Sequence, residues 1–110
     1  MKSLAESTTN YFKYWGEKNI TALADLLSED VRLKDREIEV SGIESVLEAN
    51  SNIFASVKNL GVSVEDLSYG ENTVFCKITV HANDTDIPVV DILEFNEAGK
   101  IKNITAYRGN

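Results

Sequence analysis

The fold is decided by the stretch IPVVDILEF (residues 87–95), NEAGK (96–100) and IKNITAYR (101–108). Two apolar runs flank a short polar segment, a pattern that predicts a long β-hairpin. Gly99 lies in the polar segment and can adopt the positive φ that a hairpin turn requires. The rest of the chain is interpreted outward from this hairpin.

The first arm of the hairpin carries a carboxyl group in an apolar row. Because side chains alternate along a strand, Asp91 shares one face with Val89, Leu93 and Phe95. A carboxylate buried without a partner is costly, so such a group is either partnered or protonated. Asp91 is therefore the strongest indication of function in the sequence.

Length and composition limit the function classes. The 110 residues leave room for a single domain spanning residues 1–110 with a modest core. A net charge of −7 disfavours nucleic acid as a partner, because phosphate binding needs clustered Lys and Arg. No apolar run is long enough to cross a membrane, and the N-terminus lacks a secretory pattern, so a cytoplasmic location is expected.

The N-terminal part predicts two short helices. Ser3 and Glu6 form a capping-box pattern that begins the first helix, and Gly16 ends it. Its apolar stripe is Leu4, Thr8, Tyr11, Phe12 and Trp15. Asn19 caps a second helix, and the short connection predicts that the two helices fold back on each other.

The middle of the chain predicts a strand and a third helix. Residues 31–35 alternate, so Asp35 ends the apolar face of a half-buried strand. Ser41 and Glu44 resemble another capping box, which would open a helix with Phe54 on its apolar stripe. From Leu60 onward, alternating runs separated by turns predict four strands, the first with a bulge near residues 66–67.

This order predicts the α+β class. Three N-terminal helices would pack on a curved, mainly antiparallel sheet, giving a cone-shaped barrel or roll. A long twisted sheet under only three helices can leave a hollow between the layers. Such a hollow, lined by apolar groups and a few polar ones, has the usual composition of a small-molecule site.

The order of elements and the ending FNEAGKI (residues 95–101) resemble the nuclear-transport-factor-2-like superfamily, which includes ketosteroid isomerases and SnoaL-like polyketide cyclases. The resemblance covers nearly the whole chain. It implies this superfamily's fold and a homodimer formed through the outer face of the sheet. It does not settle function, because members include enzymes, ligand binders and association modules.

The resemblance to ketosteroid isomerases extends to three positions. Tyr11 corresponds to that family's oxyanion-hole tyrosine, Asp35 to its aspartate base and Asp91 to its protonated aspartic acid. The resemblance implies an isomerase or cyclase that moves a proton next to a carbonyl and needs no cofactor. Its ligand would be a small hydrophobic or carbonyl-containing compound.

The sequence also departs from that family. The family follows its base with a proline, whereas here Arg36 follows Asp35. Arg108 occupies a position where the family has an apolar pocket residue. If Arg108 points inward, we expect either an anionic group in the ligand or an Asp91–Arg108 ion pair.

Further residues complete the expected site. Trp15, Phe54 and Leu93 are expected as core residues that can also form the pocket wall. No His, Cys and carboxylate cluster has the spacing of a metal site, so no metal is expected.

Two interpretations remain open. The first is an enzyme in which Asp35 removes the proton and Tyr11 with neutral Asp91 stabilises the enolate. The second is a non-catalytic ligand-binding or dimerisation module, in which Asp35 caps a turn or pairs with Arg36, and Asp91 pairs with Arg108 or orients a ligand.

Overall fold

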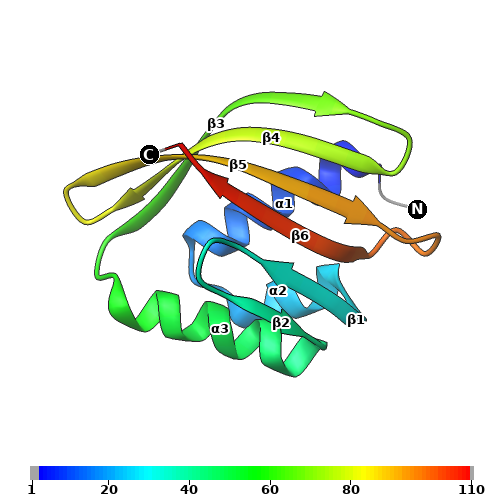
Figure 1. Ribbon diagram of the computed structural model, residues 1–110, viewed down its shortest axis with the longest axis horizontal. Coiled ribbons are helices and arrows are strands. Elements are labelled where there is room, and N and C mark those ends of the chain that lie inside the picture. Colours follow the sequence, from blue (N-terminus) through cyan, green and yellow to red (C-terminus); the bar gives the residue numbers. More distant parts are fainter. Residues whose placement is uncertain (1–2, 110) are drawn as a thin grey trace.

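A computed structural model describes residues 3–109 and contains three helices on one side of a six-stranded sheet (Figure 1). The helices are α1 (Leu4–Gly16), α2 (Ile20–Leu26) and α3 (Ile43–Ser56). The strands are β1 (Leu27–Lys34), β2 (Glu39–Ser41), β3 (Leu60–Tyr69), β4 (Thr73–Ala82), β5 (Thr85–Phe95) and β6 (Ile101–Arg108). The predicted α+β arrangement is confirmed.

The first two helices begin at the predicted caps. Ser3 accepts a hydrogen bond from the backbone N–H of Glu6 (3.1 Å), and Asn19 accepts one from that of Ala22 (3.1 Å). Each bond satisfies an amide that has no partner within its helix. Gly16 is the last residue of α1, as predicted.

The predicted capping box at α3 is wrong, although the helix itself is present. The N-cap is Gly42, at φ 91° and ψ 144°, and no side chain caps the helix. Ser41 is instead the last residue of β2, where it pairs with Arg32 of β1. A glycine supplies the turn because only a residue without Cβ adopts this backbone conformation readily.

The strands are ordered β2-β1-β6-β5-β4-β3. All neighbours are antiparallel except β1 and β6, which run parallel, so the sheet is mixed. The predicted hairpin is formed by β5 and β6, with Gly99 at φ 80°. The register of β3 against β4 shifts between Val64 and Asp66, which confirms the predicted bulge.

The helices bridge the two ends of the curved sheet. α1 packs against the edge strand β3, whereas α3 packs against β1 and β2 at the opposite end. α2 contacts both α1 and α3 and so joins the two helices. Figure 1 shows β5 and β6 crossing between these ends, in front of α1. The inner face of β5 and β6 is therefore the part of the sheet that the helices enclose.

None of the helices in the described part of the chain combines the length and the hydrophobicity of a membrane span.

Candidate functional site: a cavity between the helices and the sheet

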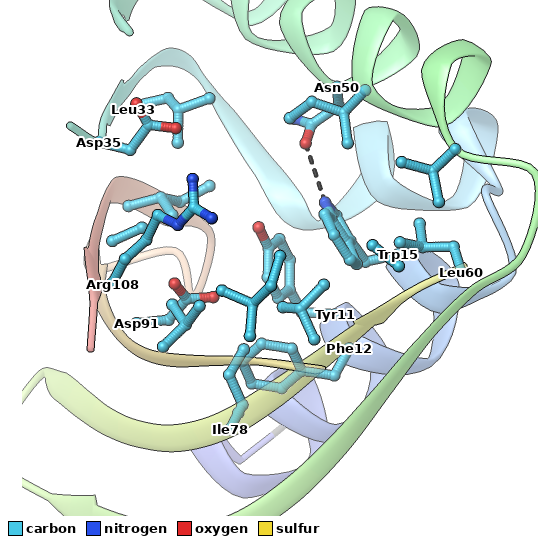
Figure 2. A pocket seen from close by; sticks show the side chains of 18 residues that line it. Tyr11, Phe12, Trp15, Leu33, Asp35, Asn50, Leu60, Ile78, Asp91 and Arg108 are labelled. Carbon is cyan, nitrogen blue, oxygen red and sulfur yellow. Dashed lines mark hydrogen bonds between the residues drawn. The ribbon is translucent and has the colours of Figure 1, made fainter. Parts of the chain in front are cut away.

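A cavity of about 240 Å³ lies between α1, α3 and the inner face of the sheet (Figure 2). Apolar side chains form most of its wall. Six lining residues carry a polar or charged group: Tyr11, Trp15, Asp35, Asn50, Asp91 and Arg108. All three residues expected to be catalytic thus open into one cavity, together with two of the four expected ligand contacts.

The sheet sets the relation between the two carboxyl groups. Asp91 on β5 pairs with Ala106 on β6. On the other side of β6, Lys34 of β1 pairs with Thr105, so Asp35 comes level with Ala106. Adjacent strands lie about 4.8 Å apart, which puts the Asp35 and Asp91 backbones about 10 Å apart. The small Ala106 side chain lies between them and leaves space for a ligand.

Asp91 is the buried acid of the cavity. Its side chain is 9% exposed, and no hydrogen bond to its carboxyl group is found among residues 3–109. Burial raises its pKa from 3.8 to about 7, and the negative charge of Asp35 adds to this shift. Near neutral pH a large fraction of Asp91 is therefore protonated and can donate a hydrogen bond.

Tyr11 projects from α1 into the same cavity as Asp91 (Figure 2). The residue is 5% exposed. Burial raises its pKa well above the usual value of 10.0, and the charges of Asp91 and Cys76 raise it further. Its phenol consequently stays neutral and remains a hydrogen-bond donor. Tyr11 and protonated Asp91 are two donors in one apolar chamber.

Asp35 has two roles in the structure. One carboxylate oxygen accepts hydrogen bonds from the backbone N–H groups of Glu37 (2.8 Å) and Ile38 (2.7 Å). The structural interpretation, in which Asp35 caps the turn after β1, is therefore correct for this oxygen. The half-buried side chain also lines the cavity, so the turn holds a carboxylate at its wall.

A hydrogen-bonded pair forms the helical wall. Trp15 donates from its indole nitrogen to the Asn50 side-chain oxygen (3.0 Å), and the Asn50 amide donates to the Val46 carbonyl (2.9 Å). Asn50 is a cavity residue that was not predicted from the sequence. The signal was present, because Asn50 lies four residues from both Val46 and Phe54 and so interrupts the apolar stripe of α3.

Two expected wall residues lie outside the cavity lining. Phe54 packs edge-to-face against Trp15, with ring centroids 5.5 Å apart, and so supports Trp15 from behind. Leu93 is completely buried in the core, one inward position beyond Asp91 along β5. Both residues stabilise the wall without facing the space inside it.

Arg108 lines the cavity although it is exposed. Ile104, Ala106 and Arg108 share the inner face of β6, which the sequence pattern had left undecided. Figure 2 shows the guanidinium directed toward the cavity that holds Asp35 and Asp91. In the described part of the chain it forms no ion pair with either carboxylate, so the Asp91–Arg108 pair expected as one alternative is absent.

Residues 3–109 contain no group of three or more His, Cys, Asp or Glu side chains arranged to hold a metal ion.

Comparison with known proteins identifies the family. The family model of the SnoaL-like domain matches residues 8–104. The chain belongs to the SnoaL-like family. The match includes Tyr11, Asp35 and Asp91 and excludes Arg108, so the family model says nothing about the residue at the cavity mouth. No curated protein matches this sequence significantly.

Solved structures share the fold at low sequence identity. A candidate SnoaL-like polyketide cyclase from Shewanella denitrificans superposes with a TM-score of 0.87 at 15% identity, covering 96% of this chain and 89% of that one. A candidate ketosteroid isomerase from Kribbella flavida superposes with a TM-score of 0.86 at 18% identity, covering 97% of this chain and 78% of that one. A nuclear-transport-factor-2-like protein of unknown function from Cytophaga hutchinsonii superposes with a TM-score of 0.84 at 14% identity, covering 98% of this chain and 91% of that one. These likenesses confirm the fold.

The raised pKa of Asp91 predicts a pH-dependent stability. The folded protein binds a proton at Asp91 more tightly than the unfolded chain does, so stability falls as pH rises from 3.8 to about 7. Asp91→Asn removes this dependence. We expect the free energy of unfolding of the variant, relative to wild type, to rise by about 3 kcal/mol between about pH 5 and about pH 8 in urea denaturation.

The exposed Asp84→Asn is the matched control and should leave the profile unchanged, since Asp84 lies in the solvated turn before β5. Parallel wild-type and Asp91→Asn profiles would contradict the assigned burial of a shifted carboxyl group.

Proposed function

We propose that this protein binds a small carbonyl compound and moves a proton next to its carbonyl group without a cofactor. The observation that supports this most is the convergence of Tyr11, Asp35 and Asp91 on one largely apolar cavity. The raised pKa of Asp91 adds to it, because a neutral acid can stabilise a developing oxyanion. Structural neighbours described as candidate isomerases and cyclases are consistent with this reaction class.

Each residue has a role in the proposed isomerisation of a β,γ-unsaturated ketone. Asp35 takes a proton from the carbon between the carbonyl and the double bond, and the electron pair moves to the carbonyl oxygen. Tyr11 and protonated Asp91 donate hydrogen bonds to the resulting dienolate oxygen. Asp35 then returns the proton to the γ carbon, so the double bond becomes conjugated and no atom is gained or lost.

The turn after β1 suits Asp35 to the base role. Its backbone donors occupy one oxygen and fix the orientation of the carboxylate, while the side chain still lines the cavity. Hydrogen bonds that lock a catalytic group in place reduce the reorganisation needed at the moment of reaction. Ala106 supplies the open space in which the reacting carbon would lie, between Asp35 and Asp91.

The test is isomerisation of 3-cyclohexen-1-one to 2-cyclohexen-1-one, followed by the ultraviolet absorbance of the conjugated product. Asp35→Asn should lower kcat/KM by about 10²–10⁴-fold, because the base is lost. Tyr11→Phe should lower it by about 10²–10³-fold, because one oxyanion donor is lost.

Tyr14→Phe is the control, because Tyr14 is a half-buried tyrosine of the same helix that does not line the cavity. A wild-type rate equal to that of buffer would reject this reaction for this substrate. An active Asp35→Asn variant would reject the assigned base.

The alternative function, a ligand-binding or dimerisation module, is favoured by the outer face of the sheet. Phe75, Val90 and Tyr107 are 45%, 40% and 60% exposed. Val90 pairs with Tyr107, and Phe75 pairs with the neighbouring Ile92, so these side chains form one patch on the face opposite the cavity. Such a patch marks an interaction surface. We propose that it joins two copies of the chain as a homodimer.

Tyr107→Asp tests this interface, because a carboxylate within the patch would be buried in the dimer at high cost. We expect sedimentation velocity to show a dimer for wild type and a monomer for the variant. Asn52→Asp adds the same charge on the exposed face of α3 and should remain dimeric. A wild-type monomer at micromolar concentration would contradict the homodimer.

A further inference from the structure

Arg108 is the one cationic side chain that the structure places in the cavity lining, and no described residue forms an ion pair with it. On the inner face, Asp91 pairs with Ala106, so Arg108 is the diagonal cross-strand neighbour of Asp91. Diagonal neighbours lie about 7–8 Å apart, within reach of a long side chain. The two strand positions are therefore close enough for an Arg108–Asp91 ion pair, and its absence is not explained by their separation.

We infer that the ligand carries a carboxylate or a comparable anionic group and that Arg108 binds this group at the cavity mouth. The inference rests on the proposed function and adds the ligand class to it. A guanidinium presents a planar fork of donors that matches a carboxylate in a bidentate geometry. At a mouth walled by Ile87 and Val89, that attraction is stronger than in open water.

The ladder also sets the spacing of the two recognised ligand groups. Arg108 lies two residues beyond Ala106, which is level with Asp91. Two residues of strand correspond to about 7 Å. A ligand that reaches both ends thus has its carbonyl or hydroxyl oxygen separated from its acid group by a ring or a short chain. Asp35, one strand away from Ala106, disfavours the reverse orientation because it would repel an acid group placed deep in the cavity.

Two probes of nearly equal shape test the inference. The phenol of 3-(4-hydroxyphenyl)propionate mimics the enolate oxygen, and its side chain carries the acid. The neutral 3-(4-hydroxyphenyl)propionamide has the same phenol and no charge. Trp15 is the only tryptophan of the chain and lines the cavity, so its fluorescence reports the binding of both.

Wild type should bind the acid about tenfold more tightly than the amide, as expected for a charge-assisted bidentate contact. Arg108→Gln should remove this preference and leave amide affinity within about twofold, since the phenol end of the site is unchanged. Arg108→Lys should retain only part of the preference because the fork is lost. Arg32→Gln deletes the same charge from the exposed face of β1, and this variant should keep the full preference for the acid over the amide.

Equal binding of acid and amide by wild type would overturn the inference and leave the proposed oxyanion site intact. A preference that survives in Arg108→Gln would overturn it in the same way. Failure of both probes to bind would overturn the proposed site and the inference together.

Discussion

The site depends on one constraint, the burial of the Asp91 carboxyl group in a largely apolar wall, where no described residue forms a hydrogen bond with it. Ionising it there is costly, so the fold favours the protonated form. Burial acts on two neighbouring elements as well. It raises the pKa of Tyr11 on α1 well above its usual value and that of the Cys76 thiol on β4 to about 12, and the charge of Asp91 adds to both shifts. Three groups that would otherwise titrate separately are thereby kept in their neutral, proton-bearing states.

The features of the fold that follow local rules could be predicted from the sequence. The β5–β6 hairpin follows from two apolar runs and Gly99, and the caps at Ser3 and Asn19 follow from side-chain chemistry within one turn of helix. Asp91 could be singled out for the same reason, because a carboxylate in an alternating apolar row breaks the pattern wherever the strand lies. Such signals need only the few residues around them.

The features that depend on which strands become neighbours could not be predicted. Parallel pairing of β1 with β6 brings Asp35 level with Ala106 and Asp91, and nothing in residues 31–35 alone specifies that partner. The side to which Arg108 points depends on the register of β6 against β5, and both faces of this strand carry apolar residues. At α3, tertiary pairing of Ser41 in β2 overrode a local capping pattern and left the turn to Gly42.

The two faces of the sheet carry different functions in this account. The proposed ligand site uses Asp91, Ala106 and Arg108, which line the cavity on the inner face, and the proposed dimer interface uses Phe75 and Tyr107, which are exposed on the outer face. The central claim concerns the inner face, and the pH titration of the Asp91 side-chain carboxyl carbon by ¹³C NMR tests it most directly. We expect a midpoint of about 7 in wild type, because burial raises this pKa, and a lower midpoint in Asp35→Asn, because the charge of Asp35 contributes to the shift. A midpoint near the ordinary value of 3.8 would contradict the account.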